Sequence, residues 1–223
     1  MTTDRIILFV TGIGTDVGKT VCSAVLTEWL KADYWKPVQA GGLDQTDRKT
    51  VSELTSPGTV THPEAVRLKL AASPHKAARK EQKFISAENL VLPETRNNLI
   101  IEGAGGLYVP VNDHLCMIDW IEQLGVEVAL VARNYLGCIN HTLLSIQALQ
   151  QRSIPLKYLI FNGPFDEDTR RVLLSYPDIQ TTAIDIPDFK TLNAQSIARA
   201  ARRLSREHGS PTTDYPLIKT INL

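Results

Sequence analysis

An apolar run, a glycine-rich loop and an amphipathic stretch follow one another at residues 6–31, and this order constrains the fold more than any other feature. Ile6–Thr11 is typical of a buried strand, and the apolar periodicity of Lys19–Lys31 predicts a helix. The connecting loop reads Thr-Gly-Ile-Gly-Thr-Asp-Val-Gly and leads directly into Lys19 and Thr20. A strand, a glycine-rich turn and a helix that opens with Lys-Thr form the setting that a phosphate-binding loop requires.

The loop offers a polyphosphate several donors at once. Glycines let the backbone turn its N–H groups inward, and the start of the helix adds a partial positive charge. In such loops the lysine, here Lys19, reaches the β- and γ-phosphates, and the hydroxyl, here Thr20, ligates Mg²⁺. The sequence departs from the generic pattern at Ile13, where that pattern has glycine. The alternative interpretation is a glycine-rich turn with a chance Gly-Lys-Thr.

Strand-like and helix-like stretches alternate along most of the chain. Runs typical of buried strands lie at Tyr34–Lys36, Leu99–Glu102, Val126–Ala132 and Leu156–Phe161. Helical patterns fall at Met117–Leu124, Ile139–Arg152, Asp166–Ser175 and Gln195–Glu207. This alternation predicts an α/β fold: a single domain over residues 1–223, with a doubly wound, mostly parallel sheet and helices on both faces, of the P-loop NTPase type.

Two parts of the sequence give weaker signals. The stretch at residues 41–96 is polar and contains several prolines, and its organisation is not evident. Its basic run, Lys76–Lys83, is expected to be a solvated helix face. The tail from Gly209 onward, with two prolines, is expected to wrap over the surface.

The composition excludes several classes of protein. Hydrophobic residues make up 43% of the chain, which argues against wholesale disorder. Lys plus Arg (24) equals Asp plus Glu (24), and this balance disfavours nucleic acid and anionic membranes as partners. The apolar runs fall well short of the roughly 20 residues that a membrane span needs. Cys22, Cys116 and Cys138 are odd in number and widely spaced, so we expect reduced thiols and a cytoplasmic location.

Two charged residues follow strand-like runs and are expected near the phosphate loop. Glu102 closes the run Leu99-Ile100-Ile101 and precedes Gly-Ala-Gly-Gly, whose small side chains would not block a ligand. A carboxylate at the end of a buried strand is costly unless it is paired or metal-bound. Glu102 is therefore expected either to hold Mg²⁺ or to form a structural ion pair. Lys36 ends the second strand, where it can neutralise charge during phosphoryl transfer or remain a plain surface lysine.

Other polar residues carry less information on their own. Asp47 lies in an ordinary loop sequence, and Asn140 has the alternative interpretation of a plain helix N-cap. A zinc site is not supported, because four of the histidines form no ligand cluster with each other. They are His62, His75, His114 and His208.

Taken together, five motifs resemble those of the dethiobiotin synthetase family. They are Gly12 with Thr15-Asp16-Val17-Gly18-Lys19-Thr20, Lys36-Pro37-Val38, Glu102-Gly103-Ala104-Gly105-Gly106, Leu136-Gly137-Cys138-Ile139-Asn140-His141, and Asn162. They occur in the family's order over most of the chain, and the longer first loop is a feature of this family. Gly-Lys-Thr alone is shared by many ATPases, whereas the combination of the motifs is much more specific.

The resemblance implies ATP- and Mg²⁺-dependent ring closure of 7,8-diaminononanoate in biotin biosynthesis. One amine takes up CO₂ to give a carbamate, whose oxygen attacks the γ-phosphorus of ATP to give a carbamic-phosphoric anhydride and ADP. The second amine then attacks the activated carbon, which releases phosphate and closes the cyclic urea of dethiobiotin. The resemblance also implies a homodimer with shared active sites.

Residue by residue, the resemblance implies the following roles. Lys19 and Lys36 look like the catalytic lysines, and Thr20, Asp47 and Glu102 look like the metal shell. The residues that resemble the nucleotide site are Thr15, Asp16, Val17, Gly18, Lys19, Thr20, Val21, Asp47, Glu102, Gly103, Ala104, Gly105, Asn162, Gly163, Pro187, Asp188 and Phe189. Those that resemble the substrate site are Lys36, Ala40, Gly41 and, from the neighbouring subunit, Gly137, Cys138, Ile139 and Asn140.

Three positions depart from the family's pattern. Ala40 stands where the family usually has a hydroxyl residue, Gly14 replaces a residue that is often acidic, and the stretch near Ala194 lacks an acidic residue by the ribose.

Two other ATPase classes compete with the resemblance. A nucleotide-switch ATPase of the partitioning type would usually carry a second lysine early in its loop. An amide-forming synthase of the cobyrinate type would need a glutamine-hydrolysing half as well.

Overall fold

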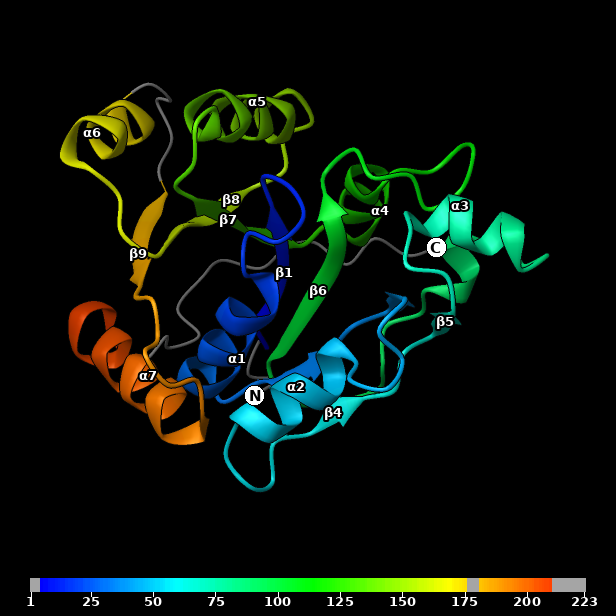
Figure 1. Ribbon diagram of the computed structural model, residues 1–223, viewed down its shortest axis with the longest axis horizontal. Coiled ribbons are helices and arrows are strands. Elements are labelled where there is room, and N and C mark those ends of the chain that lie inside the picture. The colour runs from blue at the N-terminus through cyan, green and yellow to red at the C-terminus, as the bar shows by residue number, and fades with distance from the viewer. Residues whose placement is uncertain (1–4, 176–180, 210–223) are drawn as a thin grey trace.

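A computed structural model describes residues 5–175 and 181–209, and the chain alternates strands and helices as predicted (Figure 1). The strands are β1 (Ile7–Gly12), β2 (Asp33–Trp35), β3 (Val38–Ala40), β4 (Thr61–His62), β5 (Val66–Leu68), β6 (Leu99–Gly106), β7 (Glu127–Arg133), β8 (Leu156–Asn162) and β9 (Thr182–Ile186). The helices are α1 (Lys19–Leu30), α2 (Asp47–Leu54), α3 (Pro74–Lys80), the 3₁₀ helix η1 (Ala87–Asn89), α4 (Met117–Leu124), α5 (Cys138–Gln151), α6 (Glu167–Ser175) and α7 (Ala194–His208).

The main sheet has seven strands in the order β4-β2-β6-β1-β7-β8-β9, and every pairing is parallel. β1 is the central strand, where Phe9 pairs with Ile101 of β6 and Val128 of β7. The chain places β2, β4 and β6 on one side of β1 and β7, β8 and β9 on the other. In such open sheets, ligands bind beyond the carboxyl ends of the strands near the point where the strand order reverses.

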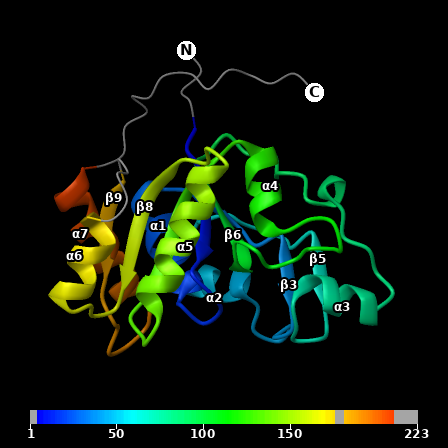
Figure 2. The same cartoon turned by 90° about the horizontal axis from the view of Figure 1, so that it is seen from above.

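Helices cover both faces of this sheet, as predicted for a doubly wound fold (Figures 1 and 2). One face packs against α1, α2 and α7, and the other against α4, α5 and α6. The side chains of β1 serve both layers in turn. Phe9 packs edge-on against Trp120 of α4, with ring centroids 5.4 Å apart, while Leu8 and Val10 lie in the layer that contains α1. This two-sided burial explains the near-continuous apolar runs of the strands.

The stretch at residues 41–96 forms α2, β4, β5, α3 and η1, and β5 pairs with β3 in a separate two-stranded parallel sheet. Strands of two or three residues are too short to show a period. The basic residues Lys76 and Lys80 of α3 are exposed, as predicted. The predicted end of the strand at Glu102 was wrong, because β6 continues alongside β1 as far as Gly106. The predicted course of the tail after Gly209 lies outside the described residues.

Candidate active site

The loop between β1 and α1 presents the start of the helix to any ligand that enters there. Gly18 is the N-cap of α1 in the left-handed region (φ 86°), and no described side chain caps the helix. The first N–H groups of the helix are therefore available to an anion. Lys19 is buried, and its ammonium donates to the carbonyl oxygen of Gly14 at 3.0 Å. Burial, and then the charge of Lys36, lower the pKa of Lys19.

Lys36 follows β2 directly and points toward two carboxylates. Its Nζ lies 2.7 Å from Asp47 Oδ2 and 2.9 Å from Glu102 Oε1, and it donates to the carbonyl oxygen of Gly103 at 3.1 Å. Burial alone would lower the pKa of Lys36, but Glu102 and Asp47 raise it above its ordinary value. Lys36 as a whole residue is 5% exposed, so the alternative of a surface lysine is wrong and the site holds a charged ammonium.

Glu102 is buried within β6 and has a donor on each carboxylate oxygen. Oε1 accepts from Thr20 Oγ1 at 3.0 Å and from Lys36 Nζ at 2.9 Å. Oε2 accepts from the hydroxyl of Tyr34 at 2.8 Å. The sequence interpretation missed Tyr34. The signal was present, because residues two apart on a strand share a face and Tyr34 is two residues before Lys36.

Asp47 is the first residue of α2 rather than part of an ordinary loop. Thr46 caps this helix by accepting from the backbone N–H of Lys49 at 3.2 Å. Gln39 of β3 accepts from the backbone N–H of Asp47 at 3.2 Å and donates to the carbonyl of Gly41 at 3.0 Å. The amide of Gln39 thus fixes the start of α2 against the β3 segment. Its position directly after the Lys36-Pro37-Val38 motif gave no indication of this role.

Most of the residues expected at the phosphate and substrate sites line one cavity of about 670 Å³. The expected residues that line it are Thr15, Asp16, Gly18, Lys19, Thr20, Lys36, Ala40, Asp47, Glu102, Ala104 and Gly105. Another part of the wall is formed by residues 71–73, which precede α3, and by Pro74, the first residue of α3. Gly41 sits just behind this wall, since a Cβ there would lie 2.5 Å from that of Ala71. The sheet and the β3–β5 pair therefore enclose a polar cleft at the phosphate loop.

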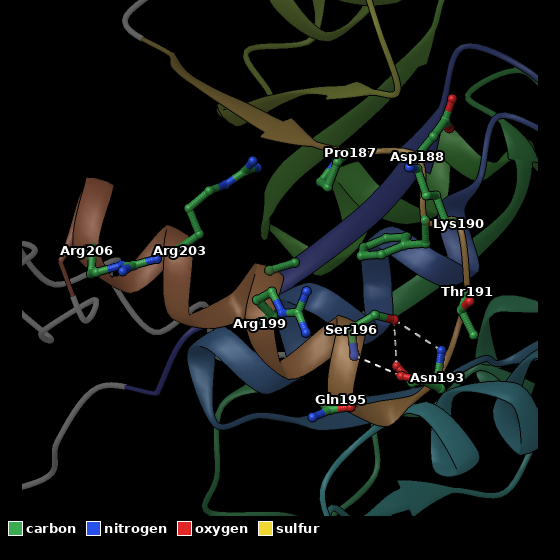
Figure 3. A pocket seen from close by; sticks show the side chains of 12 residues that line it. Pro187, Asp188, Lys190, Thr191, Asn193, Gln195, Ser196, Arg199, Arg203 and Arg206 are labelled. Carbon is green, nitrogen blue, oxygen red and sulfur yellow. Dashed lines mark hydrogen bonds between the residues drawn. The ribbon is translucent and has the colours of Figure 1, made fainter.

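The expected adenine-side residues reach the loop from β8 and β9. Asn162 is buried, and its Nδ2 donates to the carbonyl oxygen of Val17 at 2.7 Å. The N–H of Gly163 donates to the carbonyl of Ile186 at 2.7 Å, and the carboxylate of Asp188 lies beside Gly163. Pro187, Asp188 and Phe189 line a second cavity, of about 630 Å³, against α7 (Figure 3). Most of the expected nucleotide residues thus line one of two cavities, while Asn162 and Gly163 line neither. Val21 follows Thr20 on α1 and lines neither of them.

The expected carboxylate-binding residues 137–140 form the start of α5. Gly137, not Asn140, is the N-cap of this helix, so the alternative interpretation of Asn140 as the N-cap was wrong. No described side chain caps this helix, and Asn140 is exposed. None of these residues lines the cavity around Lys36 in the described part of the chain.

The oxygen atoms near Lys36 suit a hard divalent cation. The carboxylates of Asp47 and Glu102 converge on one ammonium, and the hydroxyl of Thr20 contacts the same oxygen of Glu102. Residues 5–175 and 181–209 contain no group of three or more His, Cys, Asp or Glu placed to hold a metal. A site with two carboxylates and a hydroxyl leaves positions for phosphate oxygens and water, which is how Mg²⁺ is usually bound. The residues present therefore fit Mg²⁺.

Comparison with curated proteins decides the family. The "ATP-dependent dethiobiotin synthetase BioD" of Cytophaga hutchinsonii is 52% identical over 170 residues, which are 75% of this chain and 82% of that protein. The protein of the same name from Paramagnetospirillum magneticum is 41% identical over 86% of this chain and 92% of its own length. The chain belongs to the dethiobiotin synthetase family. A family model described as "AAA domain" also matches residues 7–196 of this chain.

Solved structures support the fold of this family member. A ParA family ATPase from Chlorobium tepidum superposes with a TM-score of 0.52 at 12% identity, over 90% of this chain and all of that chain. The septum site-determining protein MinD from Pyrococcus horikoshii gives 0.50 at 16% identity, over 92% of this chain and 97% of its own. At such identities the likeness concerns the fold alone. The P-loop NTPase fold predicted from the sequence is confirmed.

Proposed function

We propose that this chain catalyses the ATP-dependent ring closure of 7,8-diaminononanoate with CO₂ to dethiobiotin. The observation that carries the proposal is the position of Lys36, a buried and charged ammonium in the same cavity as Lys19 and the phosphate loop. The reaction must bring a carbamate and a γ-phosphate into contact, and both are anions. Two buried cations in one cleft are suited to that task.

The chemistry divides into three balanced steps. One amine of the diamine adds to CO₂ and loses a proton, which gives the carbamate. A carbamate oxygen forms a bond to the γ-phosphorus as the bond to the β–γ bridging oxygen breaks, so ADP leaves with that electron pair. The second amine then attacks the carbamoyl carbon, phosphate leaves, and the amine proton is lost as the ring closes.

The residues of the cleft take separate parts in these steps. Lys19 and the N–H groups at the start of α1 bind the β- and γ-phosphates. Lys36 contacts the carbamate and the γ-phosphate, where it offsets the negative charge as the two oxyanions meet. Ala40, which lines the cleft, borders the diamine, and Gly41 supports it from behind the wall. Pro187, Asp188 and Phe189 border the adenine, with Asn162 and Gly163 beside them. The remaining loop residues, Thr15 to Val17 and Gly103 to Gly105, shape the walls.

Mg²⁺ would be held by Thr20, Asp47 and Glu102 together with phosphate oxygens. When bound, such an ion neutralises charge on the phosphates and aligns them for in-line transfer. The protein's own contribution is to hold these oxygen atoms in place with Lys36 and Tyr34.

The complete enzyme is proposed to be a homodimer. The bare start of α5 at residues 137–140, which lies away from Lys36 in the described chain, supports a role in binding the substrate carboxylate for a second subunit. Leu136, which precedes it, is fully exposed. Residues 1–223 are proposed to act as one synthetase domain.

A cytoplasmic protein without nucleic-acid or membrane partners is also proposed. The charges balance, and the three cysteines are free thiols. Among the helices that the structure describes, none combines the length and apolar character needed to cross a bilayer.

The deciding experiment measures the dependence of ATP turnover on the diamine. Purified protein with diaminononanoate, bicarbonate, Mg²⁺ and ATP should form ADP and dethiobiotin in equal amounts. Omission of either the diamine or bicarbonate should abolish ADP formation. ATP hydrolysis that is indifferent to the diamine would contradict the proposal and favour a nucleotide switch.

A further inference from the structure

We propose that Tyr34 is a positioning residue for Glu102, whose carboxylate it holds in a fixed rotation with one oxygen directed at the phosphate loop. The inference rests on the proposed function, because it takes Glu102 as a ligand of the Mg²⁺ that accompanies ATP. It assigns a task to a residue that the sequence motifs do not single out.

The two residues meet across neighbouring strands at the centre of the site. Tyr34 lies on β2, where it pairs with Ile100 of β6, two residues before Glu102. Its hydroxyl donates to Glu102 Oε2 at 2.8 Å. Tyr34 is 0% exposed and Glu102 is 1% exposed, so no bulk water competes for this bond. The contact is therefore a permanent feature of the folded protein.

The carboxylate has different partners on its two oxygens, and this difference gives the contact a direction. Oε1 faces Thr20 and Lys36, which line the cavity. Oε2 faces Tyr34, which is part of the core behind the cavity with residues of α1 and α2. A carboxylate fixed at Oε2 cannot rotate to exchange its oxygens. Oε1 thus stays toward the position where a phosphate-bound cation would lie.

The phenol is suited to this task because it acts only as a donor to the carboxylate. A phenol is an uncharged donor near neutral pH, so it adds no charge to a site with two carboxylates and two lysines. Partners behind a metal ligand typically change metal affinity by 10- to 100-fold when they are removed.

The test replaces the hydroxyl alone and measures metal binding without turnover. Mn²⁺ binding to the full-length protein–ADP complex is followed by electron paramagnetic resonance for wild type, Tyr34→Phe and Tyr158→Phe. Tyr158 is a buried tyrosine of β8 in the same core layer and serves as the matched control. We expect the Mn²⁺ dissociation constant to rise about tenfold or more in Tyr34→Phe and to stay within about twofold in Tyr158→Phe.

A second readout separates positioning from general damage. ADP binding in the presence of a chelator should stay within about twofold of wild type in Tyr34→Phe, because the deleted hydroxyl donates to Glu102 and not to the phosphate loop. If the Mn²⁺ constant is unchanged in Tyr34→Phe, the inference is overturned. It is overturned equally if metal-free ADP binding weakens in parallel, since that result indicates a damaged fold.

Two further variants keep the inference testable. If Tyr34→Phe does not fold, 4-fluorophenylalanine at position 34 fills the volume of the hydroxyl without donating a hydrogen bond, and an unchanged Mn²⁺ constant would then refute the inference. Glu102→Gln should weaken Mn²⁺ binding at least as much as Tyr34→Phe does. A smaller effect would show that Glu102 is not a metal ligand. The failure of the proposed function gives a different result. If the wild type makes no dethiobiotin but Tyr34→Phe still weakens Mn²⁺ binding, the proposed reaction is refuted and the positioning role stands.

Discussion

The ammonium nitrogen of Lys36 lies 2.9 Å from Glu102 Oε1, and the two side chains are 6% and 1% exposed. Removing two charges from water is costly, and this cost is offset only when the pair has good geometry and further hydrogen bonds. Here Glu102 has three donors and Lys36 three acceptors. The pair therefore persists without a ligand and holds a cation at the centre of the cleft.

Lys36→Gln should reduce turnover by at least about 100-fold, because the oxyanions then meet without a neutralising cation. ATP binding should weaken far less, since Lys19 and the start of α1 remain in place. Turnover by a coupled ADP assay and ATP binding by calorimetry check this, with folding confirmed by circular dichroism. A parallel fall in turnover and binding would show that Lys36 has no special role in the transition state.

Gly18→Ala should destabilise the protein by about 1–3 kcal/mol and weaken ATP binding at least tenfold. A Cβ at this left-handed position (φ 86°) would lie 2.1 Å from Asn162 Nδ2, and backbone strain of this kind typically costs that amount. Gly14→Ala is the matched control, because a Cβ there meets nothing within 4 Å. Urea unfolding and ATP titrations of both variants give the comparison. Equal behaviour of the two variants would contradict the packing argument.

Asn162→Ala should cost about 1–3 kcal/mol of unfolding free energy, because the buried carbonyl of Val17 loses its donor. The phosphate loop would lose its contact with β8, so the ATP dissociation constant should rise as well. Asn134→Ala removes a comparable bond, to the carbonyl of Pro164, at an exposed position and should change stability little. Thermal unfolding with and without ATP measures both effects. If Asn162→Ala lowers the unfolding free energy less than Asn134→Ala does, the prediction is contradicted.

A pH-dependent contribution to stability is predicted at the opposite end of β2. Burial alone would raise the pKa of Asp33, but hydrogen bonds from Thr95, Asn97 and His62 hold it below its ordinary value. The stabilisation is fully present above the unfolded-state pKa of about 3.9 and is lost as pH falls through the lower folded-state value. Asn97→Ala should therefore cost about 1 kcal/mol at neutral pH and progressively less in acid.

Urea unfolding of wild type and Asn97→Ala across the acidic range checks this dependence. The difference in unfolding free energy should shrink as the pH falls below about 4. A difference that is independent of pH would mean that Asn97 acts through the backbone turn and not through the charge of Asp33.

The sequence predicted the frame of the fold and the phosphate site because both depend on strong local patterns. Apolar runs such as Val126–Ala132 mark strands that are buried on both faces, and Gly-Lys-Thr after the first run marks the loop. The convergence of Lys36 and Glu102 followed from the rule that parallel strands end at one edge of a sheet. That edge also explains why the phosphate loop, Lys36 and Glu102, far apart in sequence, line one cavity.

The remaining features depend on contacts that have no local signature. β4 consists of Thr61 and His62 only, and its pairing with Trp35 leaves no period to detect. Asp47 begins a helix whose placement relies on the amide of Gln39 from a neighbouring strand. The bond from Tyr34 to Glu102 joins residues 68 positions apart. Such contacts are set by tertiary packing, which a single sequence does not encode in short windows.

The bond between Asn162 and Val17 has a consequence for the nascent chain. The ribosome synthesises the nucleotide loop early, but Asn162, whose side chain holds the carbonyl of Val17, is added 145 positions later. Because β8 must first join the sheet next to β7, the loop cannot be fastened co-translationally until most of the strands have been made. The contact that joins the loop to β8 is therefore absent from nascent chains that end before Asn162.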